Sequence, residues 1–137
     1  MVANIRSGSS PGGALHYNKE KVDKDEAEVL YWQKMLEPFD KHGRMDVDAC
    51  MESFRPYLEA NRRTTNTVFH VSLNPSPEDK LTDEQLREIA REYMERMGYG
   101  DQPYIVFKHT DIDRHHLHIV SLRVDENGRK LSHDYEA

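Results

Sequence analysis

The segment from His109 to Val120 constrains the fold of this chain more than any other part of the sequence. Within it, His116 and His118 are two residues apart in a run of β-favouring residues. In a strand, residues two apart point to the same face of the sheet. The two imidazoles are therefore expected to stand side by side on one strand.

A third histidine, His109, closes the preceding strand candidate, which begins at Tyr104. A short connection would join the two strands as an antiparallel hairpin, in which directly opposed residues share a face. A register that sets His109 opposite His116 or His118 brings the three rings together, whereas a register opposite Leu117 does not. Three histidines that leave coordination positions open are typical of a catalytic metal rather than a structural one.

The other residues of this segment have simpler interpretations that compete with a role at the metal. His-x-His is a weak signal by itself, and the third histidine in strand–turn–strand context is what favours a metal site. His115 alternates to the opposite face and is predicted not to be a ligand. Asp111 is either a turn residue or a carboxylate that orients a ligand imidazole from outside the ligand set. We adopt the second role and group Asp111 with the candidate catalytic residues.

Composition limits the class of protein. The 137 residues fit one domain. No apolar run approaches the roughly 20 residues of a membrane span, and the N-terminus lacks the layout of a signal peptide. The single Cys50 excludes an intramolecular disulfide and fits a reducing cytosol. We therefore expect a cytoplasmic protein with no membrane partner.

The formal net charge of −6 argues against binding nucleic acid by bulk electrostatics. It leaves room for a local basic groove. One basic cluster contains Lys19, Lys21 and Lys24, and further basic residues flank the histidine segment. Each cluster is either a solvated face or a ligand contact, and the sequence leaves both open.

Patterning elsewhere predicts interleaved helices and strands. The best-marked helix has Thr82 and Gln85 as a capping box, an apolar stripe from Leu86 to Met97, and Gly98 as its stop. The other predicted elements are a strand at Val2–Arg6, a flexible loop at Ser7–Gly13, a helix from Ala14, a helix at Asp46–Ala60 that Pro56 would interrupt, a strand at Thr65–Leu73, strands at Tyr104–His109 and His116–Val124, and a returning strand at Arg129–Ser132. The segment Val29–Phe39 mixes apolar and polar residues and is left unassigned. The class is α+β, a mainly antiparallel sheet with helices packed on it.

Metal ligands alone do not identify the reaction, because a nucleophile or an activated water is also needed. Tyr17 is the candidate nucleophile, since it follows a Gly/Ser-rich loop and lies at the start of a predicted helix. Its hydroxyl would then be presented beside the metal. A single tyrosine is more often a half-buried packing residue, and Tyr31 is the nearest rival.

These motifs resemble those of the relaxases, the mobilisation nucleases of conjugative and mobilisable plasmids and transposons. The likeness is to the Bacteroides-type members of this histidine-hydrophobe-histidine endonuclease superfamily. The family's metal motif is His-x-Asp, a spacer, then His-x-His and apolar residues, which fits His109, Asp111, His116 and His118. Arg114 departs from it, since many members have a histidine there. The segment from Gly8 through Tyr17 to the following asparagine resembles the nucleophile motif.

The resemblance implies a relaxase nuclease domain over residues 1–137. Since such proteins are usually longer, a C-terminal truncation is one interpretation. It also implies nicking of one DNA strand at a transfer origin, with Tyr17 forming a 5′-phosphotyrosyl intermediate. The implied partners are single-stranded DNA at that origin and accessory mobilisation proteins. The family is usually described as working with Mg or Mn, while imidazoles favour Zn, Mn, Co or Ni over Mg.

The proton acceptor for Tyr17 and three rival functions stay open at this stage. The metal, Asp111 or His70 could accept or destabilise the proton of Tyr17. A water-activated, metal-dependent phosphoesterase with a structural Tyr17 is a rival function. A non-catalytic DNA-binding module of the same fold is another, and a rolling-circle replication initiator would share the chemistry.

Overall fold

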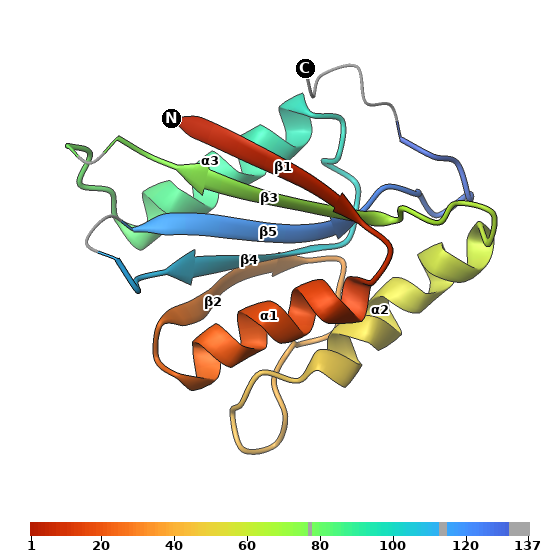
Figure 1. Ribbon diagram of the computed structural model, residues 1–137, viewed down its shortest axis with the longest axis horizontal. Helices are drawn as coiled ribbons and strands as arrows, with labels where there is room; N and C mark the ends of the chain where they lie inside the picture. Colours follow the sequence, from red (N-terminus) through yellow and green to blue (C-terminus); the bar gives the residue numbers. More distant parts are fainter. Residues whose placement is uncertain (77, 113–114, 132–137) are drawn as a thin grey trace.

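Five antiparallel strands and three helices make up the part of the chain that the computed structural model describes, residues 1–76, 78–112 and 115–131 (Figure 1). The sheet order is β1-β3-β5-β4-β2, and every pair of neighbouring strands is antiparallel. The strands are β1 (Val2–Gly8), β2 (Ala27–Gln33), β3 (Val68–Asn74), β4 (Tyr104–His109) and β5 (His116–Leu122). The helices are α1 (Pro11–Asp23), α2 (Val47–Ala60) and α3 (Asp83–Arg96). The predicted α+β class is confirmed.

The helices cover both faces of the sheet, so that two apolar cores form. Leu15 of α1 and Phe54 of α2 pack with Ile105 and Phe107 of β4 on one face. On the other face, α3 packs its buried stripe against alternate residues of the same central strands, such as Val106. Because the central strands are buried on both faces, they have nearly continuous apolar sequences.

Helix α1 begins three residues before the predicted start, and the predicted flexible loop at Ser7–Gly13 is wrong. β1 continues to Gly8, and Pro11 is already the first helical residue. The Ser10 hydroxyl accepts a hydrogen bond from the Gly13 amide at 2.9 Å. A serine N-cap followed by proline is a favourable helix start, because the proline has no amide hydrogen to satisfy and its φ suits a helix.

Other parts of the structure also differ from the predictions. β2 was not predicted, because a register shift between Val29 and Tyr31 breaks its alternation. Pro56 lies within α2 without ending it. Its position is exposed, so that water can satisfy the carbonyl that the missing amide leaves free. Instead of a returning strand, Lys130 forms only an isolated bridge with Val124.

The helix α3 follows its prediction closely. Thr82 and Gln85 form both hydrogen bonds of the capping box, at 2.8 and 3.1 Å. Gly98 has a φ of 87°, a left-handed conformation that suits glycine at a helix end. The predicted residues Arg114 and Ser132 lie outside the described part of the chain.

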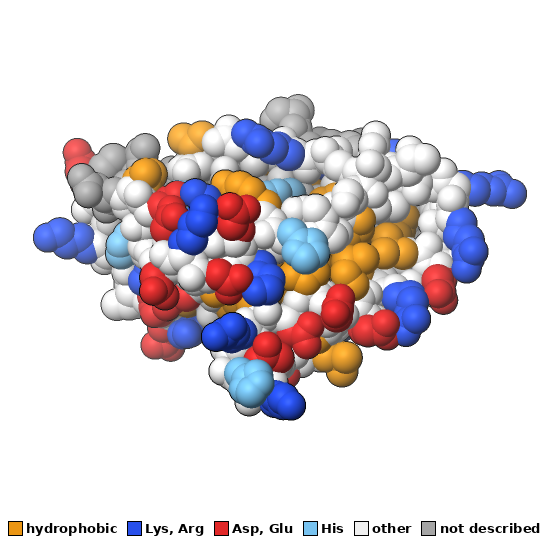
Figure 2. All heavy atoms as spheres, turned by 60° about the horizontal axis from the view of Figure 1, so that its bottom comes forward, with side chains coloured by type: hydrophobic (Ala, Val, Ile, Leu, Met, Phe, Trp, Pro, Cys, Tyr) orange, Lys and Arg blue, Asp and Glu red, His pale blue; other side chains and the backbone are white. Residues whose placement is uncertain are grey.

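The side of the molecule that carries α1 and α2 has a mixed surface. Figure 2 brings this side forward and shows acidic and basic side chains interspersed over it, with apolar side chains between them. Of the helices that the structure describes, none has both the length and the apolar character needed to cross a membrane.

Candidate metal and nucleophile site

The three predicted ligand histidines lie together on the α1 side of the central hairpin. His109 of β4 is directly opposite His116 of β5, which is one of the two registers that unite the three rings. The ring centroids of His109 and His118 are 3.9 Å apart, and each lies 5.1 Å from that of His116. One nitrogen from each ring lies within 4.8 Å of the others.

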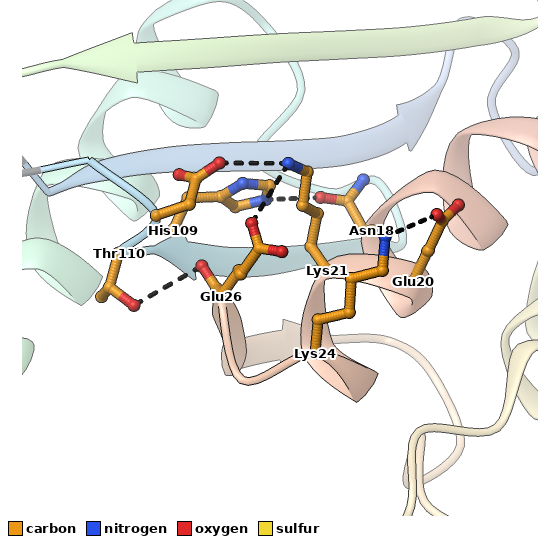
Figure 3. Close-up of polar contacts among 8 residues, drawn as sticks. Asn18, Glu20, Lys21, Lys24, Glu26, His109 and Thr110 are labelled. Carbon is orange, nitrogen blue, oxygen red and sulfur yellow. Dashed lines mark hydrogen bonds and ion pairs between the residues drawn. The ribbon is translucent and has the colours of Figure 1, made fainter.

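The hydrogen bonds around these rings identify the nitrogens that are free to bind a cation. The Asn18 Nδ2 donates to the Ala14 carbonyl at 2.9 Å, so its Oδ1 is the atom that accepts from His109 Nε2 at 2.8 Å (Figure 3). His109 therefore has its hydrogen on Nε2 and a lone pair on Nδ1. His118 Nδ1 is 3.0 Å from His70 Nε2, which leaves His118 Nε2 available.

The third ring supplies the observation that tests the fit to a metal. His116 Nδ1 is buried and has no hydrogen-bond partner among the residues that the structure describes. A buried nitrogen without a partner is costly, and coordination to an ion would satisfy it. Three imidazoles whose ligand nitrogens lie within 4.8 Å of one another are a suitable donor set for a divalent transition metal.

Burial keeps two of these imidazoles neutral. Loss of solvent, followed by the charge of His116, lowers the pKa of His109 to about 4. Loss of solvent, followed by the neighbouring histidines His109 and His70, lowers the pKa of His118 to about 2. At neutral pH the lone pairs of both rings are therefore available without competition from protons.

Tyr17 lies beside this cluster, on the second turn of α1. Its ring centroid is 6.1 Å from that of His118, 6.3 Å from that of His70 and 6.4 Å from that of His109. The Tyr17 side chain remains 45% exposed, so a substrate can reach it. The rival Tyr31 instead packs against the core on the α3 side, with its ring near Tyr104.

Comparison with known proteins agrees with this arrangement. Residues 17–137 match the model of the MobA/VirD2-like relaxase nuclease domain. The chain belongs to this relaxase family. It is also similar to Protein rlx from Staphylococcus aureus, with 29% identity over 93 residues. That alignment covers 67% of this chain and 28% of the relative, so this chain matches less than a third of that protein's length.

Two residues that no sequence motif had assigned as supports contact the histidine cluster of the relaxase domain. Asn18 holds His109, and His70 holds His118. His70 had been considered only as a proton acceptor. Loss of solvent, together with the charge of Arg6, lowers the pKa of His70. Partners of this kind fix the orientation and tautomer of metal-binding imidazoles.

Asp111 contacts Lys21 rather than an imidazole in the described structure. Its carboxylate is 3.1 Å from the Lys21 ammonium, which also lies 3.5 Å from a Glu26 oxygen (Figure 3). The pKa of Asp111 is lowered: burial acts to raise it, but the hydrogen bond from Lys21, the charge of Lys21 and smaller effects together outweigh burial. The carboxylate in turn acts to raise the pKa of His109 through its charge. A role for Asp111 at the metal stays a prediction.

His115 lies outside the histidine cluster. It is exposed. The pKa of Asp83, at the start of α3, is lowered mainly by the hydrogen bond from Lys108, and the charge of His115 makes a smaller contribution in the same direction. This placement on the α3 side agrees with the predicted alternation.

Proposed function

We propose that this relaxase domain nicks one strand of DNA at a transfer origin in plasmid or transposon mobilisation, with Tyr17 as the nucleophile. The observation that carries the proposal is the position of the Tyr17 ring, 6.1 to 6.4 Å from the rings of His70, His109 and His118. An exposed phenol next to a cluster of metal-ligand type is suited to attack a phosphate bound there.

The reaction exchanges one phosphodiester for another. The Tyr17 Oη forms a bond to the scissile phosphorus, and the bond from phosphorus to the 3′-oxygen breaks. The tyrosine loses a proton and the departing 3′-oxygen gains one, leaving a 5′-phosphotyrosyl enzyme and a free 3′-hydroxyl. Because the ester count is unchanged, the strand can be rejoined without ATP.

The ligand set in this proposal is His109 Nδ1, His118 Nε2 and a nitrogen of His116. A divalent ion held there would polarise the phosphate and offset the negative charge that builds in the transition state. Mg or Mn is proposed from the family, and the all-imidazole donor set also suits Zn, Co or Ni.

The surrounding residues have supporting roles in this scheme. Asn18 and His70 hold two ligand rings in one tautomer each. Lys21 lies one helical turn beyond Tyr17 on the same helix. Asp111 holds Lys21 and acts to raise the pKa of His109 through its charge, and we retain it as the second proposed catalytic residue.

The proposed substrate is single-stranded DNA at the transfer origin, with accessory mobilisation proteins as further partners in the cytoplasm. Single-stranded DNA leaves the scissile phosphate accessible to a tyrosine that projects from a helix. A duplex would have to be opened there first.

A covalent-trapping gel tests the nucleophile. Purified protein is mixed with Mn²⁺ and 3′-end-labelled single-stranded oligonucleotides that tile the element's presumed transfer origin, then separated under denaturing conditions. We expect label at protein mass for the parent and for the matched control Tyr31→Phe, and none for Tyr17→Phe or His116→Ala. Both tyrosine variants remove only a hydroxyl, so a difference between them reports the role of Tyr17.

The other outcomes select the rival functions. Cleavage without a covalent adduct, unaffected by Tyr17→Phe, would replace the tyrosine mechanism by a water-activated phosphoesterase. Binding without cleavage by the parent, with Mn²⁺ present, would indicate a non-catalytic DNA-binding module.

A further inference from the structure

A band of polar side chains continues the histidine cluster to the edge of the sheet. In the register of β1 and β3, Asn4 is opposite Ser72 and Arg6 is opposite His70. Ser72 is in turn opposite His118 of β5. Directly opposed residues share a face, so these side chains lie on the same side of the sheet as the ligand histidines.

The opposite face of the same two strands is apolar. There Ile5 of β1 packs with Val71 and Leu73 of β3 in the core beneath α3. The polar band is therefore not a general property of an edge strand. It is confined to the face that carries Tyr17 and the histidines.

A groove runs along this band. It has a volume of about 520 Å³ and is lined by Ala3, Asn4, Ile5, Arg6, Ala14, Tyr17, His70, Ser72 and His118. Pockets of roughly 300–1,000 Å³ commonly hold drug-sized ligands, so the groove has room for a nucleotide. Its lining contains one cationic residue, Arg6, and no carboxylate. This charge is complementary to a phosphodiester.

Arg6 is free to take an anionic partner. Exposed arginines on the helices pair with glutamates of the same helix, as Arg91 does with Glu88 and Arg96 with Glu92. Arg6 is exposed and has no ion pair within the described ranges. A guanidinium presents a planar fork of donors that matches phosphate oxygens.

The distance from Arg6 to the metal cluster suits a neighbouring phosphate. Two strand spacings separate β1 from β5, which places Arg6 about 10 Å from the strand of His116 and His118. The charge of Arg6 already acts on His70, whose pKa it helps to lower after the larger effect of burial. Arg6 and the cluster therefore lie within reach of one short stretch of DNA backbone.

We propose that Arg6 binds a phosphate of the substrate strand adjacent to the scissile phosphate, and that the groove between Arg6 and Tyr17 holds the intervening nucleotide. This inference rests on the proposed function, since it takes the occupant to be single-stranded DNA. It fixes the path of the strand, which leaves the cluster across β3 and β1 rather than along α1 past Lys21. Asn4 and Ser72 supply neutral hydrogen-bonding groups along that path.

The salt dependence of DNA binding tests the contact. Fluorescence anisotropy would follow a labelled single-stranded oligonucleotide from the transfer origin, with Mn²⁺ present, across a series of salt concentrations. The binding measurements use the Tyr17→Phe background, so that the strand stays intact. One phosphate contact to a single strand contributes roughly 0.7 to the slope of log K against log salt. We therefore expect Arg6→Ala to reduce the slope by about 0.7 and to weaken binding about fivefold at 0.1 M salt.

Two further variants make the test specific. Arg62→Ala is the matched control, because Arg62 is also exposed and unpaired in the described structure but lies in the connection between α2 and β3. We expect it to bind DNA as the background protein does. Arg6→Lys should retain the salt slope while it loses part of the affinity, since lysine keeps the charge but not the fork.

The outcomes separate this inference from the proposed function. If the trapping gel gives an adduct but Arg6→Ala and Arg62→Ala have the same slope as the background, the path across β1 is wrong and the tyrosine mechanism stands. If both variants lose slope equally, the attraction is a diffuse charge effect and the Arg6 contact is refuted. If Arg6→Ala alone loses slope while the parent gives no adduct, the groove binds DNA but the proposed reaction fails.

Discussion

Asn18→Ala is the most informative single substitution for the site. Asn18 is fully buried, and its side chain bonds both to its own helix at the Ala14 carbonyl and to His109 on β4. Because it follows Tyr17 directly, one residue ties the helix that carries the nucleophile to a ligand of the proposed ion. The substitution removes the hydrogen-bond acceptor from His109 Nε2 and leaves that N–H unsatisfied in a residue that is only 1% exposed.

Two effects should follow, with different magnitudes. An unsatisfied buried polar group lowers the free energy of unfolding by about 1–3 kcal/mol. Loss of a hydrogen-bond partner that orients a ligand imidazole weakens metal binding by roughly 10- to 100-fold, equivalent to about 1.4–2.8 kcal/mol. Asn18→Asp keeps an acceptor for His109 and adds negative charge near the cation, so we expect it to retain metal affinity.

Isothermal titration with Mn²⁺ measures the affinity, and urea unfolding in EDTA measures the stability of the metal-free protein. Asn61→Ala is a matched control, because Asn61 bonds to the Gly128 carbonyl and to the amides of Arg63 and Thr64 in a connection remote from the histidines. It should lose stability without losing metal affinity. If Asn18→Ala binds Mn²⁺ as tightly as the Asn61→Ala control does, then Asn18 is a folding residue alone and the argument from tautomers is refuted.

Two other predictions concern stability. Acidification from pH 7 to pH 5 should lower the free energy of unfolding of the metal-free protein by on the order of 3 kcal/mol. The folded pKa values of His109 (about 4) and His118 (about 2) lie below the unfolded value of 6.5, so the unfolded chain takes up protons at a higher pH than the folded chain does. Urea unfolding at several pH values checks this, and a free energy of unfolding that stays constant between pH 6.5 and 5 would contradict it. Carboxyls with a lowered pKa, such as Asp83 and Asp40, do not disturb the test, because their contribution to stability is lost only below about pH 4. Gly128→Ala should lower the free energy of unfolding by at least about 1 kcal/mol more than Gly43→Ala does, in thermal or urea unfolding. Both glycines have a positive φ, but a Cβ at Gly128 would lie 2.3 Å from the Ala60 carbonyl oxygen, while a Cβ at Gly43 meets nothing within 4 Å. Equal losses would show that the connection around Gly128 shifts to accommodate the added carbon.

The hairpin of β4 and β5 that carries the three histidines could be predicted because its signal is local. Alternation places His116 and His118 on one face, and the short connection limits the number of registers for His109. The capping box of α3 is local in the same sense, since Thr82 and Gln85 are three residues apart. Signals of this kind need no knowledge of the rest of the fold.

Asn18 could not be assigned because its partner is 91 residues away in the sequence. Within α1, Leu15, Asn18 and Val22 share one face at helical spacing. Leu15 and Val22 pack in the core on that side of the sheet. An asparagine within an apolar stripe must find a buried hydrogen-bond partner, and that is the signal that would have singled it out.

The position of the site follows from a change in polarity across the sheet. One row of opposed residues runs from Ile105 through Val120 and His70 to Arg6, from two buried apolar side chains to an exposed cation. The histidine cluster lies next to this row, where the apolar cover of α1 and α2 ends. On the apolar side, loss of solvent keeps the imidazoles of His109 and His118 neutral and available to a cation. On the polar side, the open groove admits an anionic strand. A cluster placed deeper under α1 would be closed to DNA. A cluster placed further out on β1 would have solvated histidines, and protons and water would compete with the cation for the site.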